Sequence, residues 1–348
     1  MIRHLGTLLA TAVVLCSSPG WASPMTHAAR SVIPFDVRQI ISIDYRTAKI
    51  FPTAVALKAD ALPANLKDFE SALQTVGVHP DRDIDAFTFA LFDGPRQTQE
   101  VVGVASGTFS AMTVLTQLAL GKFRPSSHRG IDIYPISKTM RVVLLDDHTL
   151  LLGKTSAVKA AINVRSGQAP SLETNREALK TIETVEKSTT WSVLDKTATQ
   201  KMLTLAVGET TKIPGFAQIR DQALGARYTI NFRGGIRFTV DVFTPDNVSA
   251  TKLSAVLKLG LLYKKVTTNP AQRSALDNVK VTSKQLTPDS PRSELRIRFM
   301  VDQREFQALL QSRCFAQLWS ERKELSGLTA EQIPDGGKQS GQFSSVSE

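Results

Sequence analysis

The segment RYTINFRGGIRFTVDVF (227–243) decides the predicted fold, because it holds two strands and the turn that joins them. Apolar and polar residues alternate on both sides of Gly234 and Gly235, which is the period of a strand with one buried face. The two glycines supply the positive φ angles that a tight hairpin turn requires. The segment therefore predicts an antiparallel β-hairpin.

The rest of the second half predicts strands and helices in alternation. Strands are expected at 189–195, 279–286 and 293–301, and helices at 197–206, 214–223 and 249–265. Asp302 and Glu305 stand three residues apart and form the capping box of one more helix.

The first half contains the same types of element. Strands are expected at 37–45, 86–92, 100–106 and 131–136, a hairpin at 140–153, and helices at 62–77, 110–120 and 156–164. In both halves the order is strand, helix, hairpin, helix, strands, helix, which suggests an internal duplication with a period of about 150 residues. The predicted fold class is α+β, with two similar halves, mainly antiparallel sheets and helices packed on one face.

The N-terminus predicts export. Arg3 and His4 precede the apolar run 5–15, and Gly20 and Ala22 supply the small residues for a cut after Ala22. No later stretch approaches the roughly 20 apolar residues of a membrane span. The mature protein is therefore expected to be periplasmic or secreted, with no transmembrane segment after signal cleavage.

The predicted boundaries follow from this pattern. They are a signal peptide at 1–22, a linker at 23–33, a first α+β half at 34–168, a second at 169–325 and a disordered tail at 326–348. The tail is assigned from its polar, Gly- and Ser-rich composition. Cleavage removes Cys16, so Cys314 has no partner for an intrachain disulfide and is expected to be a buried thiol on a helix.

Three aspartates at alternate positions, Asp81, Asp83 and Asp85, resemble the start of a calcium loop. Such a loop needs glycine at its sixth position and a bidentate glutamate at its twelfth. Ala86 and Phe92 occupy those positions. The aspartates are therefore interpreted as a turn that leads into a strand, and no metal site is predicted.

Two further motifs near residue 155 are incomplete. Gly153-Lys154-Thr155 resembles the end of a phosphate-binding loop, but His148 stands where that loop needs its first glycine. Ser156 and Lys159 fit the S-x-x-K pattern of serine-acylating enzymes, but its companion motifs are absent. Thr155 or Ser156 is expected to cap a helix, and no cofactor is predicted.

The charge pattern of the second-half strands is more informative, and the chain carries a formal net charge of +10. Cations alternate with apolar residues there, so each set is expected on its own sheet face, with Asp241 as a counter-charge. The predicted anion-binding residues are Arg227, Arg233, Arg237, Lys280, Lys284, Arg296 and Arg298. A purely solvated face, or one packed on the other half, is the alternative.

The partner is expected to be an anionic ligand, such as a lipid headgroup or lipopolysaccharide, or an envelope protein. Nucleic acid is not expected, because no aromatic residue on that face is available to stack on bases.

Two segments resemble a type of exported bacterial protein of unknown function: LPANLKDFESALQTVGVHPDRDIDAFTFALF (62–92) and DDHTLLLGKTSAVKAAI (146–162). The resemblance covers most of 35–312 and implies an α+β domain pair and an envelope location. It carries over no catalytic residue. The basic charge and the Gly/Ser-rich tail depart from that pattern.

The sequence therefore favours an exported, non-enzymatic envelope protein that binds a ligand or partner. The alternative is an exported hydrolase whose site is assembled only in the fold. Its candidate residues are Asp81, Asp83, Asp85, Asp146, Asp147 and His148.

Overall fold

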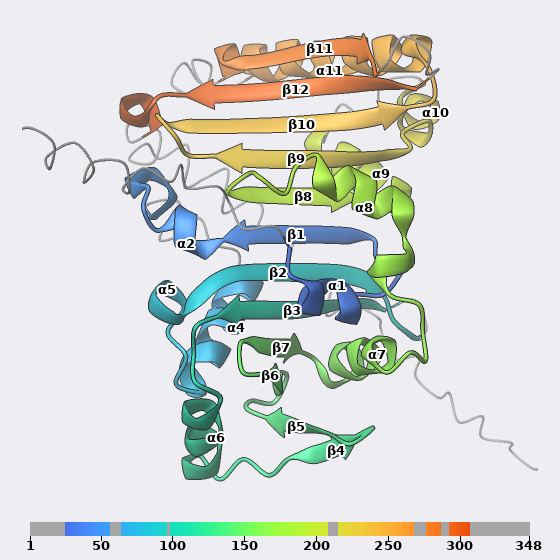
Figure 1. Cartoon of the computed structure of the whole chain (residues 1–348). Coiled ribbons are helices and arrows are strands. Elements are labelled where there is room, and N and C mark those ends of the chain that lie inside the picture. Colours follow the sequence, from blue (N-terminus) through green and yellow to red (C-terminus); the bar gives the residue numbers. More distant parts are fainter. Residues whose placement is uncertain are drawn as a thin grey trace, which may run out of the picture.

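The computed structural model describes residues 25–55, 64–95, 98–207, 215–267, 276–286 and 292–306. The predicted signal peptide, Cys314 and the tail at 326–348 lie outside these residues. The described strands form one large β-sheet, and helices pack against it (Figure 1).

The elements match most of the predicted ranges. The strands are β1 (Gln39–Asp44), β2 (Ile84–Asp93), β3 (Gln99–Gly107), β4 (Ser126–His128), β5 (Ile131–Pro135), β6 (Arg141–Asp146), β7 (Thr149–Gly153), β8 (Thr190–Leu194), β9 (Gly225–Asn231), β10 (Ile236–Thr244), β11 (Val279–Gln285) and β12 (Ser293–Val301). The helices are α1 (His27–Val32), α2 (Tyr45–Ala48), α4 (Ala64–Thr75), α5 (Pro80–Asp83), α6 (Ala111–Leu120), α7 (Thr155–Arg165), α8 (Arg176–Glu183), α9 (Lys196–Val207), α10 (Phe216–Asp221) and α11 (Asn247–Thr267), with a 3₁₀ turn at Leu172–Thr174.

The twelve strands of the described residues form one sheet in the order β11-β12-β10-β9-β8-β1-β2-β3-β7-β6-β5-β4. Neighbouring strands run antiparallel, including the central pair β1 and β8. The prediction of a mixed α+β fold with a mainly antiparallel sheet is confirmed, and the chain builds a single continuous sheet.

The side chain of Arg38 links the central strands at one end of the sheet through hydrogen bonds. Its guanidinium donates to Asp93 Oδ2 at 2.6 Å, at the end of β2, and to Asp195 Oδ2 at 2.7 Å, directly after β8. These hydrogen bonds, that to Asp93 above all, raise the pKa of Arg38 above its usual value, so the guanidinium stays charged. Arg38 precedes β1, so this one side chain links three adjacent strands.

Helices lie on both faces of the sheet around β1, as their core residues show. Ile40 belongs to a buried cluster with Val158 and Ile162 of α7, whereas its neighbour Ile41 packs against a cluster that contains Leu73 of α4. Successive strand residues point to opposite faces. We call these the α7 face, with α1, α7 and α8, and the α11 face, with α4, α6, α9, α10 and α11.

The α11 face is continuous along the sheet. Cross-strand pairs run from Ile41 through Ser192, Tyr228 and Val240 to Ile297. At the β9–β12 end, Val240 packs in a cluster with residues of α9, α10 and α11. Helices therefore cover this face at both ends of the sheet.

The α7 face is covered only in part. Figure 1 shows α1, α7 and α8 on its near side, over β1–β3, β7 and β8. Over β9–β12 this face is more open: Arg237 and Arg298 are exposed there, and the end of α8 reaches it at Thr184, which accepts from Arg227. The prediction of helices packed on one face is therefore not confirmed.

The predicted linker is wrong for its described part. Residues 27–32 form α1, and Ala29, Val32 and Ile33 are at most 1% exposed. They pack against α7 on the α7 face. The short helix was missed because six residues give too few turns for a clear helical periodicity.

The β9–β10 turn provides a stability test. Gly234 and Gly235 have φ angles of 73° and 130°, as the sequence predicted. A Cβ at Gly235 would overlap the carbonyl oxygen of Val301, whereas a Cβ at Gly234 would meet nothing within 4 Å. Gly235→Ala should lower the free energy of unfolding by about 2 kcal/mol or more, through strain and overlap.

Gly234→Asn is the matched control, because asparagine tolerates the left-handed region, and its cost should be about 1 kcal/mol or less. Urea unfolding of both variants measures the difference. Equal stability of the two variants would contradict the predicted overlap at Gly235.

Candidate anion-binding face

The register of β9–β12 places six of the seven predicted cations on the α7 face. One cross-strand row contains Arg227, Asp241, Arg296 and Thr282, and the next contains Thr229, Thr239, Arg298 and Lys280. Arg237 and Lys284 lie in the flanking rows, opposite Met300 and Glu294. Arg233 does not join them, because β9 ends at Asn231 and Arg233 lies exposed in the turn.

The first group, which we call the paired cluster, consists of Arg227, Arg296, Lys284, Asp241 and Glu294. Arg296 Nε donates to Asp241 Oδ1 at 2.6 Å, and Arg227 Nε donates to Asp241 Oδ2 at 3.0 Å. Glu294 forms ion pairs with Arg227 at 3.3 Å, Arg296 at 3.0 Å and Lys284 at 3.1 Å. Three cations thus share two carboxylates.

Burial makes these ion pairs important for the fold. The side chains of Asp241 and Glu294 are 7% and 1% exposed. A buried carboxylate is costly unless cations and hydrogen bonds compensate it. Hydrogen bonding to Asp241 raises the pKa of Arg296, and Arg227 also donates to Thr184 Oγ1 at 2.6 Å. The paired cluster therefore stabilises the sheet and has little charge left for a ligand.

The second group, which we call the open cations, consists of Arg237, Arg298 and Lys280. All three are exposed. Arg237 donates to the Met300 sulfur at 3.3 Å, which supplies no negative charge. Within the described part of the chain, no carboxylate pairs with these three residues. Lys280 and Arg298 lie directly opposite each other, and like charges in that position are destabilising.

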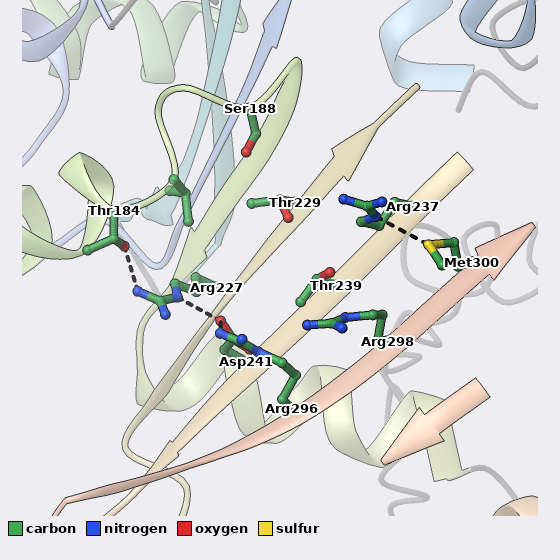
Figure 2. Close-up of a pocket in the computed structure, with 11 residues that line it drawn as sticks. Thr184, Ser188, Arg227, Thr229, Arg237, Thr239, Asp241, Arg296, Arg298 and Met300 are labelled. Atoms are coloured by element: carbon green, nitrogen blue, oxygen red, sulfur yellow. Dashed lines mark hydrogen bonds and ion pairs between the residues drawn. The ribbon is translucent and has the colours of Figure 1, made fainter. Parts of the chain in front are cut away.

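A groove of about 430 Å³ runs over this face beside the end of α8 (Figure 2). Its floor includes Arg237, Arg298 and the hydroxyls of Thr229 and Thr239, and Ser188 lies on the adjoining loop. The paired cluster lines its other end through Arg227, Asp241 and Arg296. The groove thus combines free positive charge with neutral hydrogen-bond donors.

Three contributors to this face, Glu294, Thr184 and Ser188, were not predicted from the sequence. Glu294 stands two residues before Arg296 on β12, so strand alternation alone places it on the cationic face. Thr184 and Ser188 follow α8, which the sequence analysis did not identify, and no local signal connects them to β9.

The candidate hydrolase residues have separate local partners. Asp83 accepts from the backbone N–H of His79 at 2.8 Å and from Arg82 at 2.6 Å, and these bonds, that from Arg82 above all, lower its pKa. Asp85 accepts from Arg46 at 2.9 Å, and Asp146 accepts from the backbone N–H of His148 at 2.9 Å.

The two segments that carry these residues both bond to the backbone at the end of β3. There the carbonyls of Asp83 and His148 accept from Thr108 and Gly107. A depression of about 100 Å³ at this place is lined by Asp83 and by none of Asp81, Asp85, Asp146, Asp147 and His148. Turn formation accounts for the contacts of Asp83 and Asp146.

The residues after β7 differ from the expected helix cap. Lys154 is the N-cap residue of α7 and makes no side-chain cap, whereas Ser156 donates to Glu100 Oε1 at 2.7 Å. Capping by Thr155 or Ser156 is therefore wrong, because Ser156 bonds to a buried carboxylate on β3 instead. A Cβ at Gly153 would lie 2.9 Å from the Val101 carbonyl oxygen, so strand contact explains this glycine.

The described residues contain no group of three or more His, Cys, Asp or Glu side chains placed to hold a metal ion. None of their helices combines the length and apolar character that a bilayer-crossing segment needs.

Comparison with known proteins identifies no family. No family model matches the chain, and no curated protein matches it. Among solved structures, the chain is similar to TP0453 in its crystal form I, with 11% sequence identity and a TM-score of 0.43. The match covers 84% of this chain and 99% of that chain. A likeness this distant does not bear on function.

The ion pairs of the paired cluster predict that substitution of Asp241 strongly lowers the free energy of unfolding. Asp241→Asn removes one of the two carboxylate charges that compensate Arg227 and Arg296 and leaves three cations on Glu294. The free energy of unfolding should fall by roughly 2–4 kcal/mol, somewhat less than for a fully buried pair, because Arg296 keeps contact with water. Urea denaturation measures the loss.

Asp147→Asn, at the exposed tip of the β6–β7 hairpin, is the control and should change stability by about 0.5 kcal/mol or less. A similar small change at Asp241 would show that the paired cluster does not stabilise the sheet.

Proposed function

We propose that the protein is an exported, non-enzymatic envelope protein that binds an anionic ligand or partner on the α7 face of β9–β12. The observation that carries this proposal is the group of open cations beside the groove. Six cations and two carboxylates occupy this face, and the positive excess lies on Arg237, Arg298 and Lys280. Electrostatic attraction draws an anion to such a surface.

The electrostatic repulsion between two of the open cations also supports the proposal of an anion site. Lys280 and Arg298 repel each other across neighbouring strands. A bound anion would remove that repulsion and stabilise the folded chain in proportion to its affinity. The paired cluster shows that this sheet accommodates carboxylates as partners for arginines, and the open cations have no such partner among the described residues.

We also propose that the chain consists of two similar α+β halves. Outward from the central pair, the strand order is β1-β2-β3-β7-β6 on one side and β8-β9-β10-β12-β11 on the other. On the first side, β3 pairs with β7, the last strand of that half, and β7 pairs with β6. On the second side, β10 pairs with β12, again the last strand, and β12 pairs with β11. The arrangement supports a duplication in which β4 and β5 are additions to the first half.

Export is the remaining part of the proposal and rests on the N-terminal sequence. Expression in a bacterial host should release a chain whose first residue is Ser23, because the small residues before it fit signal cleavage after Ala22. N-terminal sequencing of the envelope fraction measures this. Recovery of the chain with residues 1–22 intact in the cytosol would contradict export.

Anion binding itself predicts a strong dependence on salt. The mature chain should bind at least one member of a panel of carboxylate, sulfate and phosphate polyanions. Its affinity should fall steeply between about 50 and 200 mM salt, because exposed charges are screened over about one Debye length. Isothermal titration calorimetry at several salt concentrations measures the dependence.

Two double variants locate the binding. R237Q/R298Q should abolish most of the salt-dependent affinity. R124Q/K138Q removes the same charge from exposed positions of the first half and should leave the affinity nearly unchanged. Failure of the whole panel to bind, or equal loss in both double variants, would contradict the proposal.

A further inference from the structure

The groove also indicates which kind of anion it takes, and this step rests on the proposed function. We infer that the open cations bind a phosphate group with two or more negative charges, a phosphate monoester or a diphosphate, that belongs to a larger molecule. Arg237 and Arg298 hold its oxygens from two sides, and Thr229 and Thr239 donate further hydrogen bonds.

The first argument is the geometry of the donors. Thr239 stands two residues after Arg237 on β10 and lies directly opposite Arg298 on β12. The two guanidinium groups therefore start from diagonal positions, roughly 7–8 Å apart at the Cα atoms, a span that two long side chains can close over one group. Figure 2 shows Thr229 and Thr239 on the same floor, beside Arg237 and Arg298.

The second argument is the number and type of donors. A guanidinium offers paired N–H groups that match two oxygens of a phosphate. Two such forks and two threonine hydroxyls exceed what the two coplanar oxygens of a carboxylate can accept. A phosphate offers three terminal oxygens in a tetrahedral arrangement and accepts from several directions at once.

The third argument is charge. Arg237 and Arg298 line this end of the groove, and Lys280 lies directly opposite Arg298 beside it. None of the three has a carboxylate partner among the described residues, and Asp241 is occupied by Arg227 and Arg296. A ligand that neutralises this end of the groove needs two or three negative charges. The groove volume of about 430 Å³ lies in the range of ordinary small-molecule sites, so it admits a phosphate with an attached organic group.

The paired cluster sets the boundary of this site. Arg227 and Arg296 are held by two buried carboxylates, and their departure toward a ligand would leave those carboxylates uncompensated. The phosphate therefore binds over β10–β12 beside Thr239, with Ser188 of the adjoining loop at the rim of the groove.

The test compares inorganic pyrophosphate with citrate, a polycarboxylate of comparable charge, by calorimetry at constant ionic strength. Pyrophosphate should bind at least about tenfold more tightly. R237Q and R298Q should each weaken pyrophosphate binding about tenfold, the usual cost of one charge-assisted hydrogen-bonded contact. R124Q/K138Q should leave it unchanged. Thermal unfolding of each variant verifies that it is folded.

A charge-conserving variant separates fork geometry from charge. R237K/R298K keeps both positive charges and loses the paired N–H donors. It should keep salt-dependent binding and lose the preference for pyrophosphate over citrate. Equal affinity of the wild-type groove for citrate and pyrophosphate, with both lost in R237Q/R298Q, would overturn the phosphate inference and leave the proposed function intact. Pyrophosphate binding that is unaffected in R237Q/R298Q would overturn both.

A second arm identifies the source of the phosphate. Vesicles of phosphatidylcholine with and without phosphatidate are sedimented with the protein. Arg298-dependent sedimentation with phosphatidate, reversed by pyrophosphate, supports the inference with a lipid headgroup as the source. Pyrophosphate binding without sedimentation supports it with a soluble phosphorylated molecule as the source.

Discussion

The pairing of β1 with β8 is the contact on which the rest of the structure depends. It joins strands about 150 residues apart, from Gln39 opposite Leu194 to Ile43 opposite Thr190, and so turns two groups of strands into one sheet. Arg38 reinforces the junction through Asp93 and Asp195. This pairing fixes the register of the two central strands. Because each outer strand is in register with its neighbour, every strand residue then points to one defined face of the sheet.

The two ends of the sheet differ in how many of their faces are apolar. Around β1–β3 both faces are apolar, and helices bury both of them. Over β9–β12 only the α11 face is apolar, so a second helix layer would have no hydrophobic surface to cover. The polar α7 face is left to ion pairs and solvent, and the end of α8 borders it with Thr184 and Ser188. The groove is thus a result of where the helix layer stops.

The sequence predicted most of the local structure and part of the site. Period-two alternation in 227–243 and 293–301 correctly assigned Arg227, Arg237 and Arg298 to one face, since alternation depends only on local geometry. The division of those cations into paired and open groups was not predictable, because it depends on the relative register of four strands, β9–β12. The short helices α1 and α8 were also missed, and Arg233 was misassigned because the strand ends two residues earlier.

The division between paired and open arginines is the central claim, and NMR of the arginine Nε–Hε groups tests it most directly. The Hε resonances of Arg227 and Arg296, which donate to Asp241, should be observed in the free protein and protected from exchange with water. Those of Arg298 and of Arg237, whose Nε–H donates only to the weakly accepting sulfur of the exposed Met300, should exchange faster than those of Arg227 and Arg296 and become protected when a polyanion is added. Equal protection of all four arginines in the free protein, or a response to polyanion confined to Arg227 and Arg296, would contradict the account.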